Sequence, residues 1–197
     1  MLYFQSLLNR FCSYVLILLL FSCQKETREN SELEAIIITP EEKQVIISKI
    51  YENQKDIKLC NQERDQALSI DSAEIYPLKE NQYLVEILCF LGAYQGNYQY
   101  LLYNRVNSAI EKISFATFRD NPQNLQLTNT FTLNGSPEFD PISQTLSLET
   151  KSRGLGDCGS FVVYQWQNSE FTLREYRYKS DCDGVYLSPE KYPLIYP

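Results

Sequence analysis

Histidine is absent from the 197-residue sequence, and methionine and tryptophan occur once each. Ser-His and Cys-His catalytic pairs, the helical zinc-protease motif and most catalytic zinc sites need an imidazole, so this absence excludes them. Glycine is scarce as well, at seven residues, whereas there are 15 tyrosines and 10 phenylalanines. Such an aromatic content favours strands that pack through cross-strand pairs. We therefore expect a β-rich protein that is not an enzyme, with no catalytic residues, metal site or cofactor.

Positive charge is also in short supply. The chain has 18 lysines and arginines against 25 aspartates and glutamates, for a net charge of −7. The acidic residues are scattered along the chain, as on an ordinary solvated surface. An acidic protein is repelled by phosphate backbones and by anionic headgroups. We expect no nucleic-acid partner.

A short hydrophobic run lies at Tyr14–Phe21, preceded by Arg10. A positive residue, a run of this length and a small residue before a cleavage point are typical of a secretory signal peptide. The sequence Leu-Phe-Ser-Cys that ends at Cys23 resembles the lipobox of bacterial lipoproteins, in which diacylglycerol is attached to the thiol and cleavage precedes the cysteine. We expect residues 1–22 to be a lipoprotein signal peptide and Cys23 to be the lipid attachment site. An ordinary cleaved signal peptide or an anchor helix is the alternative.

The rest of the chain divides at a change in composition. Residues 23–34 are polar and mixed in charge, which predicts a tether. Residues 35–197 suffice for a single β-rich globular domain. Gln24 follows the predicted lipidated cysteine, where an aspartate holds enterobacterial lipoproteins in the inner membrane. We expect an exported protein that contacts the membrane through its lipid anchor, at the outer membrane facing the periplasm.

Four cysteines remain after Cys12 is assigned to the signal peptide and Cys23 to the lipid: Cys60, Cys89, Cys158 and Cys182. An even number in an exported chain predicts two disulfides, for which three connectivities exist. We prefer Cys60 with Cys89 and Cys158 with Cys182, the second because its members flank a predicted hairpin. A four-thiolate zinc site is the alternative, but no two of these cysteines have the spacing of a zinc knuckle.

The predicted hairpin has arms at Phe161–Gln167 and Glu170–Tyr176. A disulfide at its base stabilises the fold by about 3 kcal/mol if the bond is unstrained. In the implied register two pairs of large side chains share one face, Trp166 with Phe171 and Tyr164 with Leu173.

A helix is predicted from Pro40 to about Asn53, with Thr39 as its cap and Glu42 completing a capping box. It has an apolar stripe of Ile46, Ile47, Ile50 and Tyr51. Further strands are predicted at Tyr83–Phe90, Tyr98–Tyr103, Lys112–Phe118, Leu127–Leu133 and Thr145–Thr150. The expected fold class is α+β, a mainly antiparallel β-sheet with one N-terminal helix packed on it.

Two patterns look like sites but are expected to be structural. The stretch Gly156–Ser160 looks like the nucleophile turn of cysteine proteases, but it lacks a base and Cys158 is expected to be oxidised. The stretch Asp181–Glu190 overlays part of a calcium-binding loop, but Lys179 takes the first ligand position. We favour a turn held by Asx hydrogen bonds.

Several motifs together carry a family resemblance: Cys89–Gln95, Phe139-Asp140-Pro141, Arg153–Gly159, Tyr164-x-Trp166 and Cys182-Asp183-Gly184. Their order and spacing over about residues 85–185 resemble the bacterial exported family known as domain of unknown function 1176. The motif residues are structural in type, with glycines for turns, cysteines for bridges and aromatics for packing. The resemblance implies an exported protein and, since the family has no established activity, it implies no ligand.

Two functions of different classes remain open. The first is a non-catalytic binding or structural protein of the envelope that engages an envelope protein or glycan. In one version of it, by loose analogy with periplasmic lysozyme inhibitors, the loop Lys151–Gly159 is the contact, with Arg153 and Asp157 as charged candidates. The alternative is that these two residues only shape a turn, and this is the interpretation we favour. The second is a hydrolase of envelope glycan, which needs a pocket with two carboxyl groups about 5 to 9 Å apart.

Overall fold

The computed structural model describes residues 38–62, 70–78, 81–119 and 126–197. The predicted signal peptide, Cys23 and the predicted tether lie outside the described residues, so those predictions stay predictions. Among the described residues, no helix is long and apolar enough to cross a membrane.

Helix α2 spans Pro40–Glu52, and its start follows the prediction. The Thr39 hydroxyl accepts a hydrogen bond of 3.2 Å from the backbone N–H of Glu42, which satisfies one of the free donors at a helix N-terminus. Only this half of the predicted capping box forms. The Glu42 carboxylate instead accepts a 2.9 Å hydrogen bond from the Tyr83 hydroxyl and pairs with Arg105 at 3.1 Å. Helix α2 is therefore tied to residues outside the helix at its first turn.

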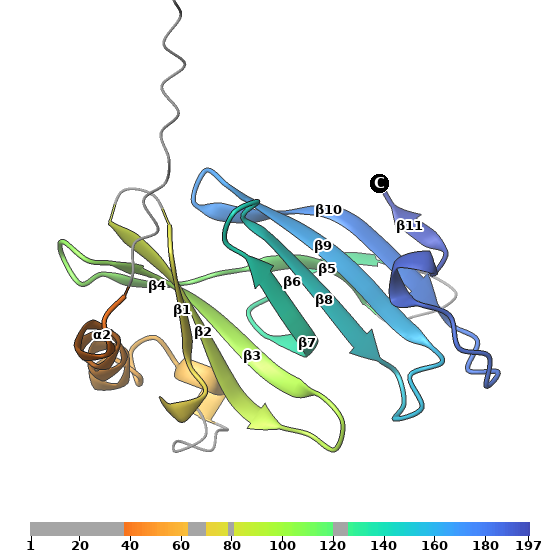
Figure 1. Cartoon of the computed structure of the whole chain (residues 1–197), viewed down its shortest axis with the longest axis horizontal. Helices are drawn as coiled ribbons and strands as arrows, with labels where there is room; N and C mark the ends of the chain where they lie inside the picture. Colours follow the sequence, from red (N-terminus) through yellow and green to blue (C-terminus); the bar gives the residue numbers. More distant parts are fainter. Residues whose placement is uncertain (1–37, 63–69, 79–80, 120–125) are drawn as a thin grey trace, which may run out of the picture. The chain divides into compact units, whose positions relative to one another are not determined.

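The strands form one large antiparallel sheet and one separate hairpin (Figure 1). The sheet order is β1-β2-β3-β7-β8-β9-β10-β11, and β4 pairs with β3 beside this path. The bounds in the sheet are β1 Glu74–Pro77, β2 Gln82–Leu91, β3 Gly96–Asn104, β4 Ile110–Lys112, β7 Leu133–Asp140, β8 Thr145–Lys151, β9 Gly159–Gln167, β10 Glu170–Lys179 and β11 Leu194–Tyr196. The hairpin consists of β5 Phe115–Arg119 and β6 Gln126–Thr130, and short 3₁₀ turns are η1 Leu59–Gln62 and η2 Pro189–Lys191. A mainly antiparallel sheet with one fully described α-helix confirms this part of the predicted fold class.

Two apolar clusters form the core. The larger lies between the sheet and the β5–β6 hairpin, where Phe115 of β5 is fully buried. Its ring lies 5.5 Å from that of Tyr100, 5.1 Å from Tyr164 and 5.3 Å from Phe171. Two of these contacts are edge-to-face and that with Phe171 is stacked, and aromatic pairs of both kinds stabilise a core beyond the area they bury. The second cluster contains the four predicted stripe residues of α2 together with buried residues of β2 and β3.

The β9–β10 hairpin has the predicted register. Trp166 lies opposite Phe171 and Tyr164 lies opposite Leu173, and all four side chains are buried in the larger cluster. The turn residues Asn168 and Ser169 both have positive φ angles, the conformation that a two-residue hairpin turn of type I′ requires.

The predicted strand Lys112–Phe118 is wrong as a single element. Strand β4 ends at Lys112 in the large sheet, and β5 begins at Phe115 in the separate hairpin. The apolar alternation continues across the break because Ile113 and Phe115 are both buried. A local pattern of this kind shows which residues face the core but not which sheet they join.

Strand β7 was not predicted, because Gly135 and Pro137 within it are typical of turns. Gly135 has a φ of +147°, and a Cβ there would lie 2.2 Å from the Glu149 carbonyl oxygen of β8. Only glycine permits this close approach of two backbones. Pro137 is tolerated because β7 pairs with β3 only over residues 133–135 and leaves Pro137 unpaired on that side.

Candidate functional site

Three segments meet at one end of the strands and form what we call the loop end, residues 92–95, 152–158 and 180–188 (Figure 1). The backbone N–H of Lys151, the last residue of β8 before the second segment, donates a 2.9 Å hydrogen bond to the Gln95 side chain of the first. The second and third are joined by the Cys158–Cys182 disulfide. Three of the five motifs that carry the family resemblance, Cys89–Gln95, Arg153–Gly159 and Cys182-Asp183-Gly184, therefore lie next to one another in space.

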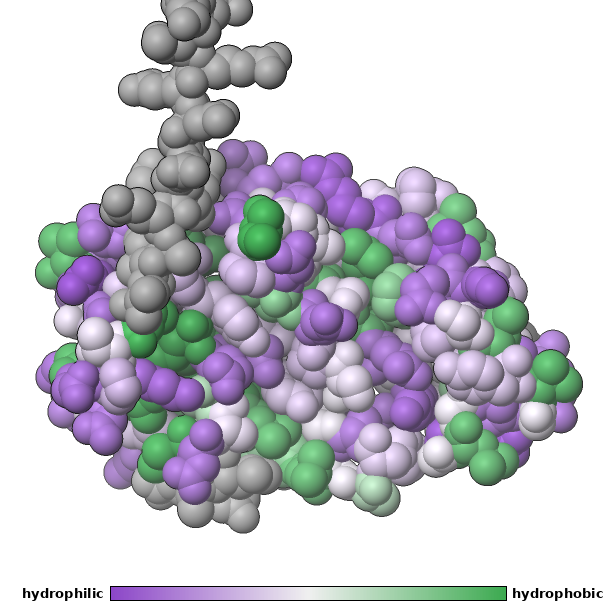
Figure 2. Space-filling model, viewed as in Figure 1, coloured by the Kyte–Doolittle hydropathy of each residue, from purple (hydrophilic) through white to green (hydrophobic). Residues whose placement is uncertain are grey.

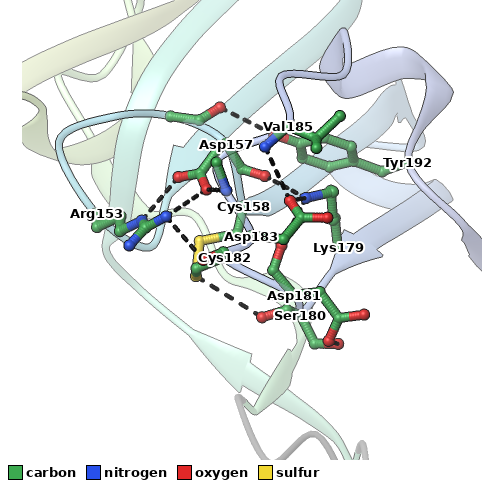
Figure 3. Close-up of polar contacts among 12 residues, drawn as sticks. Arg153, Asp157, Cys158, Lys179, Ser180, Asp181, Cys182, Asp183, Val185 and Tyr192 are labelled. Carbon is green, nitrogen blue, oxygen red and sulfur yellow. Dashed lines mark hydrogen bonds and ion pairs between the residues drawn. A yellow bond between two sulfur atoms is a disulfide. The ribbon is translucent and has the colours of Figure 1, made fainter.

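Arg153 and Asp157 hold the β8–β9 loop closed. The Arg153 guanidinium donates from Nε to Asp157 Oδ1 at 2.8 Å and from Nη2 to Oδ2, and Nη2 also donates to the Cys182 carbonyl oxygen at 2.8 Å (Figure 3). Asp157 Oδ2 accepts a further bond of 2.7 Å from the backbone N–H of Gly184. The Arg153 hydrogen bond, supported by that of Gly184, holds the pKa of Asp157 well below its usual range. One carboxylate thus fixes two segments of the loop end.

Lys179 fixes the segment that follows β10. Its ammonium group donates to the carbonyl oxygens of Asp157 and Asp181 and to Asp183 Oδ1, at 2.7, 2.5 and 2.7 Å. Asp183 Oδ1 also accepts from the backbone N–H of Val185 at 3.0 Å, which is an Asx turn. The Lys179 hydrogen bond, with that of Val185, lowers the pKa of Asp183. The cation that these three oxygens surround is therefore the ammonium group of Lys179.

Two disulfides are present, as predicted, and the cysteines pair as expected. Cys158 and Cys182 have Cα atoms 5.0 Å apart, and Cys60 and Cys89 have Cα atoms 5.4 Å apart. Both values lie in the ordinary range for disulfides. Because Cys158 is bonded, the turn at Gly156–Ser160 contains no free thiol.

Apolar side chains are exposed at the tips of the loop end. Leu155 is 74% exposed, and Tyr94, Val185 and Tyr186 are exposed as well. In Figure 2, apolar side chains lie along the lower edge of the molecule, where these loops are found in Figure 1. Single exposed apolar residues are common, but here several lie together on fixed loops at one end of the sheet.

The two predicted contact residues are placed differently from each other. Arg153 has a side chain that is 41% exposed, whereas that of Asp157 is 4% exposed and faces inward. Asp157 therefore shapes the loop that presents Leu155, and its role as a contact stays a prediction. Sequence reasoning did not assign Lys179 a partner, although its spacing of four residues from Asp183 was a usable signal.

A second polar cluster lies within the sheet. Glu86 of β2 is buried and accepts a 2.6 Å hydrogen bond from the Tyr100 hydroxyl of β3. Glu74 lies directly opposite Glu86 on β1. Burial raises the pKa of Glu86 and the charge of Glu74 raises it further, while the Tyr100 hydrogen bond acts in the opposite direction. The sequence analysis gave no reason to select this pair of carboxyl groups.

Neither of the two cavities described here, both lined by described residues, is lined by a pair of carboxyl groups. One, of about 190 Å³, lies between the β5–β6 hairpin and strands β7–β10 and is lined by no charged residue. The other, of about 500 Å³, lies beside α2 and has one carboxyl group, that of Asp71. In the same described residues, no three cysteine, aspartate or glutamate side chains are placed to hold a metal ion.

Comparison with known protein families decides the identity of the chain. A model of the family described as "Protein of unknown function (DUF1176)" matches residues 25–197. The chain belongs to this family. The match extends well beyond residues 85–185, where the sequence motifs carry the resemblance. No curated protein and no solved structure matches the chain.

Proposed function

We propose that this DUF1176 protein is an exported lipoprotein that binds another protein through its loop end and catalyses no reaction. The observation that carries the proposal is the fixation of the loop end by one disulfide and two charged pairs, Arg153–Asp157 and Lys179–Asp183. Loops that are ordered before binding lose little conformational entropy when a partner docks. Their exposed leucine, valine and tyrosine side chains are of the kind that contribute most of the energy at protein interfaces.

The charges of the loop end indicate the surface that its partner presents. The Arg153 charge is matched by Asp157 and the Lys179 charge by Asp183. The side chain at the tip of the β8–β9 loop, Leu155, is apolar. These features favour a folded partner with an apolar recess over a highly charged one. An enzyme cleft filled by the loop, as in lysozyme inhibitors, is one partner of this kind.

The rest of the domain supports the loop end. The buried aromatic cluster holds β9 and β10, from which two of the three segments extend. We also propose that α2 packs on the sheet over β2 and β3, since its buried stripe belongs to the same core cluster as residues of those strands. A rigid scaffold of this kind is what positions binding loops in many proteins.

Export and lipid anchoring are supported by two observations. Two disulfides are compatible with an exported domain, and the family match begins at residue 25, just after Cys23. We propose that Cys23 carries the lipid and that the protein faces the periplasm at the outer membrane. Intact mass of the natively expressed protein tests this directly. A mass without the diacylglycerol and acyl additions on Cys23 contradicts the anchor.

Binding through the loop end is tested by comparing variants for partner capture. We expect Leu155→Asp and Tyr186→Asp to abolish capture of a partner that the unmodified protein retains in the native envelope. Ile142→Asp is the matched control, because Ile142 is 94% exposed but lies on the β7–β8 loop. Inhibition of lysozyme by the same set of variants tests the enzyme-cleft version. Equal capture by all of the variants contradicts the proposal.

A second candidate function is hydrolysis of envelope glycan, which the Glu74–Glu86 pair favours. Residues directly opposite in an antiparallel pair have neighbouring side chains, so two carboxyl groups, as a glycosidase requires, lie on adjacent strands here. A raised pKa on one of the two carboxyl groups is the requirement for a general acid, and Glu86 meets it. Incubation of the protein with peptidoglycan tests this function. Reducing ends released by the unmodified protein, but not by Glu86→Gln or Glu74→Gln, would replace the binding proposal, and no release excludes hydrolysis.

A further inference from the structure

A hydroxyl-lined cleft lies between the β5–β6 hairpin and strands β7–β10, in the region of Figure 1 where the hairpin lies against the sheet. Its volume of about 190 Å³ is several times what one water molecule needs. Seven of its lining residues carry a hydroxyl or an amide: Thr117, Thr130, Thr132, Asn134, Thr150, Ser160 and Tyr176. None of the residues that line the cleft belongs to the loop end, and the proposed function does not use the cleft.

Ser160 is the polar group that points to a ligand. It is 8% exposed and lies on the same face of β9 as Val162 and Tyr164, which belong to the larger core cluster. Ser160 lines the cleft, and its side chain makes no hydrogen bond to another residue in the described part of the chain. A hydroxyl group can both donate and accept a hydrogen bond, so Ser160 Oγ is available to a molecule that enters the cleft.

The other polar groups of the cleft are held in place but keep bonding capacity. Thr150 Oγ1 donates a 2.7 Å hydrogen bond to the Asn134 carbonyl oxygen, and Thr130 Oγ1 donates at 3.0 Å to the carbonyl oxygen of Thr132. Each of these hydroxyl oxygens still has a lone pair with which to accept a bond. The cleft therefore presents fixed acceptors beside the Ser160 hydroxyl, which can both donate and accept.

The composition of the walls selects the chemistry of the ligand. None of the residues that line the cleft is charged, so a charged ligand would lose its hydration without an opposite charge to replace it. An apolar wall is supplied by Phe118, whose ring lies 4.9 Å from that of the buried Tyr176. A lining that combines several hydroxyl groups with an aromatic ring matches the polar edge and the apolar face of a sugar ring.

Gly135 keeps this space open. A Cβ at this position would lie 2.8 Å from Leu148 Cδ1 and 3.0 Å from Thr150 Oγ1, both of which belong to residues that line the cleft. From these features, the geometry points to a binding site for one neutral saccharide ring between the hairpin and the sheet. The ring comes either as a free monosaccharide or as a unit of a glycan chain.

Titration of the full-length protein with sugars, followed by two-dimensional NMR, tests this site. Glucose and N-acetylglucosamine are the monosaccharide probes, and maltotriose and chitotriose are the chain probes. We expect chemical-shift changes in the backbone amides of β6 to β9 around the cleft. Saturable shifts with a monosaccharide assign the site to free sugars, whereas shifts with the trisaccharides alone assign it to glycan chains.

Variants of the lining residues distinguish a loss of binding at this site from a general effect on the fold. Ser160→Ala and Thr132→Val each remove one hydroxyl and are expected to lower affinity about fivefold, the effect of one hydrogen bond. Ser147→Ala is the matched control, because Ser147 lies on the opposite face of β8 from Leu146 and Leu148. Thermal unfolding shows which variants remain folded. If Ser160→Ala does not fold, Thr132→Val still tests the site. The site is excluded if no probe shifts the cleft amides, or if both variants bind as tightly as the unmodified protein.

Discussion

Arg153 and Asp157, four residues apart on the β8–β9 loop, form a doubly hydrogen-bonded ion pair in which only the arginine reaches solvent. The same carboxylate accepts from Gly184 in the segment after β10, and the same guanidinium donates to the Cys182 carbonyl oxygen. Two residues from one motif therefore join two segments that are about 25 residues apart in sequence. This ion pair therefore fixes the conformation of the loop that carries the motif, at one end of the sheet.

Replacement of Asp157 tests how much this ion pair contributes to the free energy of unfolding. We expect Asp157→Asn to lower the free energy of unfolding at neutral pH, because Arg153 loses its charged acceptor while the asparagine stays buried. The pKa of Asp157 is lowered in the folded state, so its stabilisation is present above the ordinary value of 3.8 and lost as the pH falls through the folded value. Urea denaturation between about pH 2 and pH 7 measures both effects. Asp181→Asn, at an exposed position, is the control and should change little.

The disulfide at the base of the β9–β10 hairpin makes a separate contribution. We expect Cys158→Ser combined with Cys182→Ser to lower the free energy of unfolding by about 3 kcal/mol, because the bond closes a segment of 24 residues. Partner capture through the loop end should weaken as well, since the segment after β10 loses its covalent tie. Urea denaturation of the double variant measures the first effect. A double variant as stable as the unmodified protein would contradict this prediction.

The burial of Glu86 predicts a pH dependence of the opposite sign. Burial raises the pKa of Glu86 above its ordinary value of 4.5, so protonated Glu86 stabilises the fold fully below that value. This stabilisation is lost as the pH rises through the folded value. Glu86→Gln keeps an acceptor for Tyr100 and removes the ionisation, so it should be more stable than the unmodified protein at neutral pH. Denaturation from about pH 4 to pH 8 checks this, and parallel curves for the two proteins would refute it.

The aromatic core predicts that truncation of Phe115 lowers the free energy of unfolding much more than truncation of Phe131. Phe115 is fully buried among three rings, so Phe115→Ala should lower the free energy of unfolding by about 3–5 kcal/mol. Phe131 is 49% exposed and contacts the Lys112 ammonium at 5.0 Å. Phe131→Ala should therefore cost no more than about 1 kcal/mol. Thermal and urea unfolding of the two variants compare the sites, and similar losses would show that the hairpin is not held by this core.

What the sequence by itself determined about this protein is mostly local. The start of helix α2 follows from Thr39 and Pro40, and the register of β9 and β10 follows from the alternation of large side chains on either side of a short turn. The Cys158–Cys182 pairing follows from that hairpin in turn. Each of these rests on residues close in the chain, where periodicity and turn chemistry suffice.

Only the tertiary structure decided the remaining features, because they depend on segments far apart in the chain. Strand β7 exists because Gly135 lets β8 approach closely, although glycine and proline in isolation indicate a turn. Glu86 has a raised pKa because of its position between β1 and β3. The cleft exists because the chain leaves the large sheet after β4 and forms a second hairpin against it. The physical reason is that burial and proximity arise from long-range packing, which a local pattern of apolar and polar residues does not specify.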